Sequence, residues 1–198
     1  MTNDIRIEGT VSLIGADHHW HASRRLRQEW PSVTWADVGS EPRQPAVMLE
    51  TSQDLEEGAF RITVGQRDGI PLVNVTGGPF SGTIYGVEQL VQRLAAVDAK
   101  GVTVSSGTFE SAPGLTYRTF WTWDHSTNWD LEQIGMQEIG VFNPYGKPPD
   151  GFLADYTRLV DFMSRNCIPA VVIYGMFRNS HGGVEAAQAL CRYADRGA

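Results

Sequence analysis

The sequence predicts an α/β protein: a small α+β domain followed by the first two β/α units of an incomplete TIM (β/α)8 barrel. Two patterns predict this architecture. Short β-type runs, a hairpin and helical stretches fill residues 1–112, whereas residues 113–198 run strand, helix, strand, helix. A closed barrel needs eight strands and about 250 residues. We therefore expect a truncated second domain, whose sheet is completed by the missing remainder of the barrel or by a partner chain.

The composition is that of an ordinary globular protein, with 41% hydrophobic and 20% charged residues. The formal net charge of -7 argues against a nucleic-acid partner or an anionic membrane, because no basic stripe is present to bind phosphates. No signal-peptide pattern opens the chain, and no apolar run reaches the length of a membrane-spanning helix. The sequence therefore predicts a soluble, cytoplasmic protein.

Neither a metal nor a cofactor is expected. The two cysteines, Cys167 and Cys191, fit no metal or redox spacing, and we expect both to be buried thiols in a reducing compartment. A helix through the cluster His18, His19 and His21 would place the first and third on one face. No carboxylate or fourth ligand follows at a recognisable spacing, so surface or partly packed histidines are the preferred interpretation.

The elements of the first domain follow from periodicity and turn residues. Asp17 would cap a helix over 18–30, which Pro31 ends. Two alternating runs flank a four-residue turn at 66–69 and form the clearest hairpin in the chain. This half offers no nucleophile, base or metal cluster, so a supporting role is expected. Its other expected elements are strands at 11–14, 45–50 and 102–104, a helix from 81, and a linker over 105–114.

One stretch, residues 116–129, organises the second domain. Aromatic and β-branched residues alternate over 116–123, as is typical of a strand, and hydrogen-bonding side chains follow it. Ligands bind at the carboxyl ends of parallel strands, and rings beside fixed donors and acceptors suit a sugar. A buried aromatic strand with an ordinary polar turn is the alternative. The second strand, 168–174, is almost continuously apolar, which predicts burial on both faces.

The candidate site consists of side chains on or after these two strands. Charged and polar groups would bind sugar hydroxyls, and Trp121 or Trp123 would stack on the ring. Strand alternation puts Arg118 and Asp124 on the face opposite the tryptophans, which favours the Arg118–Asp124 pair. The loop after the second strand would reach the same rim. The predicted substrate-binding residues are Arg118, Trp121, Trp123, Asp124, His125, Arg178 and His181.

No catalytic residue is predicted within the chain. Glycoside hydrolysis commonly needs two carboxyl groups that flank the bond to be cleaved, or one acid together with a substrate group. Asp124 is the only carboxylate of the second domain at the carboxyl end of a strand, whereas Asp155, Asp161 and Glu185 fall within helices. We therefore expect the 198-residue chain to be inactive by itself.

The residues on both sides of the domain boundary resemble a known family. An expected helix carries a G-x-x-Y-G-x-x-x-L-x-x-L-like pattern, and the next strand carries Arg118 followed by Trp123 and Asp124. Over roughly residues 45–198 the chain resembles the N-terminal domain and the start of the catalytic barrel of bacterial β-hexosaminidases and α-glucuronidases. The resemblance implies a glycoside hydrolase whose catalytic carboxylates lie on later strands, beyond residue 198. The helix pattern matches at Gly82, Tyr85, Gly86, Leu90 and, shifted by one position, Leu94.

Three functions fit these patterns. The first is a glycosidase of that type, hydrolysing O-glycosyl bonds of oligo- or polysaccharides and present here as an N-terminal fragment. The second is a non-catalytic carbohydrate-binding or assembly module that uses the same rim. The third is an unrelated α/β domain whose aromatic strand is core. Further β/α units encoded after codon 198 would favour the first.

Overall fold

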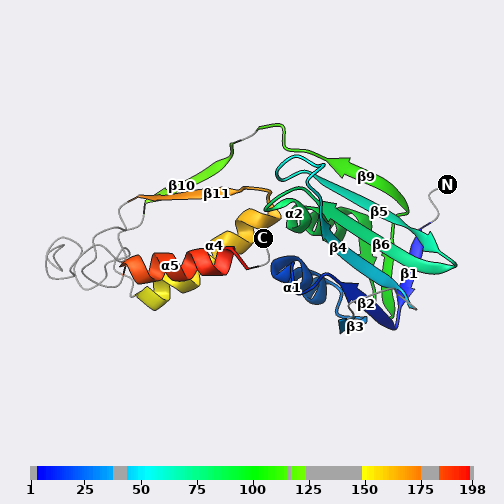
Figure 1. The fold of residues 1–198 in the computed structure, drawn as a ribbon. Coiled ribbons are helices and arrows are strands. Elements are labelled where there is room, and N and C mark those ends of the chain that lie inside the picture. Colours follow the sequence, from blue (N-terminus) through cyan, green and yellow to red (C-terminus); the bar gives the residue numbers. More distant parts are fainter. Residues whose placement is uncertain (1–3, 38–43, 116, 124–148, 175–182, 197–198) are drawn as a thin grey trace, which may run out of the picture. The chain divides into compact units, whose positions relative to one another are not determined.

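The computed structural model describes residues 4–37, 44–115, 117–123, 149–174 and 183–196 (Figure 1). The chain divides into two compact units. Unit 1 comprises Met1–Thr116 with Arg196–Ala198, and unit 2 comprises Tyr117–Asp195. Both units combine helices with β-sheet, so the predicted mixed α/β class is confirmed. None of the described helices is both long and apolar enough to cross a membrane.

Unit 1 is built on a six-stranded sheet with the strand order β3-β2-β4-β6-β5-β9. The first four strands in this order run parallel to one another, and β5 and β9 are antiparallel to their neighbours. The strands are β2 (Thr10–Ile14), β3 (Thr34–Asp37), β4 (Ala46–Thr51), β5 (Phe60–Arg67), β6 (Ile70–Gly77) and β9 (Gly107–Ser111).

The hairpin between β5 and β6 is confirmed, but its turn is shorter than expected. Arg67 pairs with Ile70, so only Asp68 and Gly69 form the loop. Their φ angles are 54° and 81°. Positive φ at both central residues is the signature of a type I′ turn, whose twist matches that of the strands it joins. The four-residue turn predicted at 66–69 was therefore wrong, because a tighter turn fits the twist of the hairpin.

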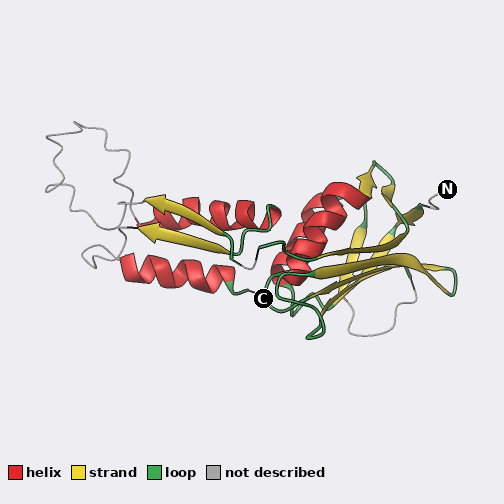
Figure 2. Cartoon of the chain, turned by 90° about the horizontal axis from the view of Figure 1, so that it is seen from above, coloured by secondary structure: helices red, strands yellow, loops and turns green. Residues whose placement is uncertain are grey.

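A small antiparallel sheet, β1-β8-β7, completes the strands of unit 1. It contains β1 (Ile5–Glu8), β7 (Ala95–Val97) and β8 (Gly101–Val104). Two helices, α1 (Trp20–Glu29) and α2 (Gly82–Gln89), lie together against the larger sheet (Figure 2), and a π-helical turn, η1 (Leu90–Leu94), continues α2.

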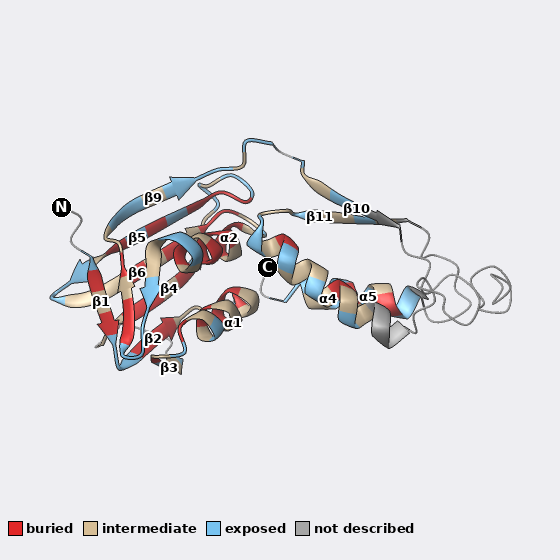
Figure 3. Cartoon of the chain, turned by 180° about the vertical axis from the view of Figure 1, so that it is seen from behind, coloured by how far each residue is buried: buried red, intermediate tan, exposed pale blue. Residues whose placement is uncertain are grey.

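Side-chain alternation decides which face of the large sheet the helices cover. Phe60, Ile62 and Val64 are buried, whereas the intervening Arg61 and Thr63 are exposed (Figure 3). Gly86 allows α2 to approach this face closely, because a Cβ atom there would lie 2.6 Å from Cγ1 of Val75. The core consists of the inward side chains of the sheet and the facing side chains of α1, α2 and β8. Its fully buried members include Ile7, Val11, Leu13, Leu26, Trp30, Val47, Val73, Val75, Leu90 and Val102.

Two expectations for unit 1 were wrong. The first helix begins at Trp20 with His19 at its N-cap and without a side-chain cap, so Asp17 does not cap it and His18 lies outside it. The linker predicted over 105–114 contains β9, which pairs with β5 from Phe60↔Ser111 to Val64↔Gly107. The edge of β5 supplies backbone partners for this segment, and this pairing is not visible in its glycine- and serine-rich sequence.

Unit 2 contains the parallel pair β10 (Thr119–Trp123) and β11 (Ala170–Tyr174), with α4 (Pro149–Arg165) between them in the chain and α5 (Gly183–Ala194) after them. The predicted order of strand, helix, strand, helix is therefore present among the described residues. Whether these elements begin a barrel stays a prediction. The two helices pack on each other around a cluster formed by Tyr156, Ala186 and Leu190.

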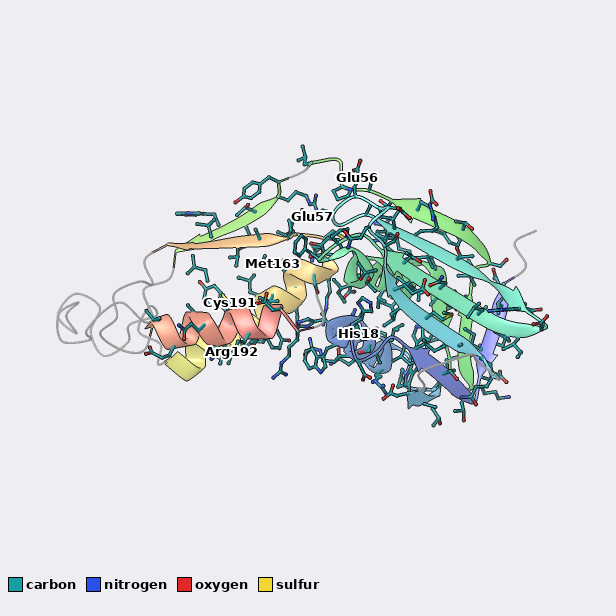
Figure 4. The ribbon with its side chains drawn as sticks, viewed as in Figure 1. His18, Glu56, Glu57, Met163, Cys191 and Arg192 are labelled. Carbon is teal, nitrogen blue, oxygen red and sulfur yellow. The ribbon has the colours of Figure 1, made fainter. Side chains whose placement is uncertain are left out.

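The burial predicted for the second strand and for the cysteines was wrong. Val172 of β11 is exposed, because in the described residues α4 and α5 pack against only one side of the pair. Cys191 is also exposed, and Cys167 is half-buried. Figure 4 shows Cys191 on α5 and Met163 near the end of α4. Cys191 lies on the outer side of its helix, and Cys167 follows α4 in a turn.

Candidate functional site

The predicted site residues divide into those that the structure describes and those that it does not. Asp124, His125, Arg178 and His181 lie outside the described residues. Trp123 is the last residue of β10, and its side chain is also outside the described part. The structure therefore places two members of the predicted set in full, Arg118 and Trp121.

The register of β10 against β11 defines two faces of the pair. Trp121 pairs with Val172, and Thr122 pairs with Ile173. Ile173 packs against the cluster of α4 and α5, so the helices cover its face at this position, whereas Phe120 on the same face is exposed. Trp121 and Val172 project to the opposite side, where their relative exposures are 59% and 42%. We call this side, formed by Thr119, Trp121, Ala170 and Val172, the open face.

The open face presents an apolar surface that includes an aromatic ring. Trp121 presents a large aromatic plane in the third of five strand positions, and Val172 lies beside it. Thr119 and Ala170, which lie two residues nearer the amino ends of their strands, are half-buried. Such a surface can stack against the apolar face of a pyranose. Val172 was missed as a neighbour of Trp121, because the register of a parallel pair cannot be read from the sequence.

Arg118 lies away from the predicted rim. It directly precedes β10, and its Nε donates a hydrogen bond of 2.9 Å to the carbonyl oxygen of Cys167. Cys167 in turn precedes β11, so both residues lie at the amino ends of the parallel strands. The rim was predicted at the carboxyl ends, about 16 Å further along at about 3.3 Å per residue. Arg118 thus lies at the opposite end of β10 from Trp123, the last described residue before the predicted rim.

Two of the three helical carboxylates singled out in unit 2, Asp155 and Asp161, contact neighbours within the unit. Asp155 pairs with Arg158 on the same helix. Asp161 accepts a hydrogen bond of 2.7 Å from the hydroxyl of Tyr193, which joins α4 to α5. These contacts agree with the interpretation that such carboxylates serve the helices.

In the histidine cluster of unit 1, His18 is exposed, His19 is buried and His21 is half-buried. Burial lowers the pKa of His19, and the neighbouring charge of His18 lowers it further. His19 also accepts the backbone hydrogen bond of Ser23 that opens α1. Across the parts of the chain that the structure describes, no group of three or more His, Cys, Asp or Glu residues could hold a metal ion.

Comparisons with known proteins connect this architecture to glycoside hydrolases. No family model matches the sequence, and no curated protein matches it. Among solved structures, a mutant β-hexosaminidase of Streptomyces plicatus in complex with its product GlcNAc matches 100% of this chain and 42% of its own, with 13% identity and a TM-score of 0.60. The β-N-acetylhexosaminidase of Bacteroides fragilis matches 100% of this chain and 41% of its own, with 13% identity and a TM-score of 0.58.

A GH138 enzyme targeting pectin rhamnogalacturonan II also matches, over 96% of this chain and 24% of its own, with 17% identity and a TM-score of 0.58. At these identities the likeness shows the fold alone. The fold likeness to β-hexosaminidases that the motifs predicted is confirmed. The chain spans between 24% and 42% of the length of these three structures.

Proposed function

We propose that the chain is the N-terminal part of a glycoside hydrolase of the hexosaminidase or α-glucuronidase type, which hydrolyses O-glycosyl bonds of oligo- or polysaccharides. In this proposal, residues 1–112 form the supporting domain and residues 113–198 the first part of a (β/α)8 barrel. The observation that carries the proposal is the match of the whole chain to less than half of a β-hexosaminidase. The open face of β10 and β11 supports it, because strands of a barrel present one face to the helices and the other to the interior.

The proposed substrate-binding surface lies at the carboxyl ends of β10 and β11. Trp121 supplies a ring for stacking, and polar residues that follow the two strands in the sequence bind hydroxyls. Arg118, a further member predicted from the sequence, precedes β10 and donates a hydrogen bond from its Nε to the Cys167 carbonyl. The other proposed members are Trp123, Asp124, His125, Arg178 and His181.

The chemical step falls to residues beyond this chain. A pair of carboxyl groups is commonly needed to protonate the leaving oxygen and to stabilise or attack the anomeric carbon. Asp155 and Asp161, two of the carboxylates of α4, are held by Arg158 and Tyr193. The 198-residue chain therefore binds sugar without turning it over.

Two measurements on the 198-residue chain test this function. Turnover is assayed on aryl glycosides, including glucuronides and N-acetylglucosaminides, and binding of the corresponding oligosaccharides by calorimetry. Trp121→Ser should weaken binding at least tenfold, because stacking on the ring is lost. Phe162→Ser is the matched control, since Phe162 is a similarly exposed aromatic residue on α4.

Three results would decide against parts of this proposal. Turnover by the 198-residue chain that a substitution within it abolishes would contradict the proposal that the catalytic carboxyl groups lie beyond residue 198. Equal binding by both variants and the unaltered chain would remove Trp121 from the site. Sugar binding together with a stop codon directly after residue 198 would favour the non-catalytic binding or assembly module instead.

A further inference from the structure

The turn between α4 and β11 has a strained residue at its centre. The backbone N–H of Ile168 donates to the carbonyl of Met163 at 2.9 Å, and that of Cys167 donates to the carbonyl of Ser164 at 3.2 Å. These two bonds define a Schellman motif, in which one residue adopts the left-handed conformation. That residue is Cys167, with φ of 54°. Glycine is usual here, because a Cβ atom disfavours this region.

The left-handed residue is also the one that Arg118 holds. Its carbonyl accepts the 2.9 Å hydrogen bond from Nε of Arg118. Arg118 lies one residue before β10, and Cys167 lies three residues before β11. The bond therefore joins the amino ends of the two strands, next to the first pair of their register, Thr119↔Ala170.

A parallel pair of strands with this composition needs a contact that fixes its register. Hydrogen bonds between parallel strands are evenly spaced, so a shift by two residues makes an equally regular ladder and leaves every side chain on its face. On the face that the helices contact, a shift by two residues only exchanges Val171 and Ile173, which are similar in shape and polarity and so discriminate weakly between these registers. A hydrogen bond at the strand ends, such as that of Arg118 with Cys167, can form in only one of these registers, because any shift of one strand along the other changes the distance between its donor and acceptor.

We propose that Arg118 is a positioning residue: by holding the Cys167 carbonyl it sets the register of β10 on β11 and so places Trp121 beside Val172 on the open face. The consequence for sugar binding rests on the proposed function. The register itself does not, and it is measured without a sugar.

Disulfide trapping in the full 198-residue chain measures the register. In a Cys167→Ser, Cys191→Ser background, Thr119→Cys is combined with Ala170→Cys, its observed partner, or with Val172→Cys, two residues out of register. Adjacent strands lie about 4.8 Å apart, so the partner pair is within disulfide reach, whereas the offset pair lies about 8 Å apart. Under diamide, we expect the partner pair to oxidise at least ten times faster.

Arg118→Ala should reduce this rate ratio to about threefold or less, because both registers become populated. Arg158→Ala is the matched control, since Arg158 is an exposed arginine of α4 in the same unit, and it should leave the ratio unchanged. Arg118→Lys keeps the charge without the guanidinium Nε, and should give an intermediate ratio. It replaces the alanine variant in the experiment if that variant is insoluble.

An unchanged ratio in a folded Arg118→Ala or Arg118→Lys variant overturns the proposal, even if the melting temperature falls, because Arg118 would then add stability without setting register. A reduced ratio with unaltered sugar binding keeps the positioning role and contradicts the proposed sugar site at Trp121. A failure of the register proposal and a failure of the proposed function therefore give different results.

Discussion

A buried ion pair between α1 and α2 offers the sharpest test of how unit 1 is held together. Nε of Arg25 lies 3.0 Å from Oε1 of Glu88, and the side chains of the two residues are 13% and 1% exposed. Gln92 donates a further hydrogen bond of 2.9 Å to Oε2 of Glu88. We consider the substitution Arg25→Met, which keeps the length of the stem and removes the charged donor.

The expected loss of stability follows from this geometry. Glu88 would keep its buried charge with only a neutral amide partner, and breaking a buried pair from one side costs about 3–5 kcal/mol. That is a large part of the 5–15 kcal/mol by which domains are typically stable. Removing both charges is different, because no buried charge is left without a partner. The double variant Arg25→Met, Glu88→Leu should therefore recover most of the loss, to within about 1–2 kcal/mol of the unaltered chain.

Amide hydrogen exchange of the fully buried strand residues Val47, Val73 and Val75 measures this in unit 1 without interference from unit 2. The free energy of opening is compared for the unaltered chain and the single and double variants. A loss below about 1 kcal/mol for Arg25→Met would refute the reasoning, because the buried carboxylate would then have found another partner. A double variant no more stable than the single one would show that the helices depend on the pair itself.

Two other predictions concern the turns. Arg6, and next the backbone N–H of Lys100, hold the pKa of Asp98 well below its usual range. A lowered carboxyl pKa stabilises the fold above the unfolded value, near 4, and this contribution is lost as the pH falls. The unaltered chain should therefore exceed Asp98→Asn in melting temperature at pH 7 and low salt, and the difference should shrink below about pH 5; a constant difference would contradict the pairing. Cys167→Gly should stabilise unit 2 by about 1 kcal/mol, because glycine adopts the left-handed conformation without strain, and slower amide exchange in β11 would show it. Faster exchange would mean that the cysteine side chain holds the turn.

Much of the fold could be predicted because local chemistry and tertiary structure agree. In the β5–β6 hairpin, alternating apolar residues meet a turn containing Asp68 and Gly69, and both specify the same register. The segment over β9 lacks this agreement. Its glycine and serine residues are typical of loops, and it becomes a strand only because the edge of β5 offers backbone partners. The short strands β1, β3 and β7 were missed for the related reason that three or four residues carry little periodicity.

The candidate site could be predicted as a place in the chain but not as a surface. Alternation correctly separates Arg118 from Trp121, yet it cannot say which face the helices cover. The sequence favoured the Arg118 face, and the packing of Ile173 against α4 and α5 shows that the Trp121 face is the open one. That choice depends on contacts between residues of β11 and of helices far along the chain, which no local pattern encodes.

The amino end and the middle of β10 therefore carry different chemistry. At its amino end, Arg118 donates a hydrogen bond to a carbonyl of the chain itself, and at mid-strand the exposed Trp121 lies on the open face. A guanidinium on the open face would compete with the ring for the same ligand surface, whereas one at the amino end can hold the strand and leave the ring accessible. Arg118 thus fixes the register of β10, and Trp121, three residues later, presents its ring on the open face. Any shift of β10 along β11 would break the hydrogen bond of Arg118 and also move the Trp121 ring away from Val172.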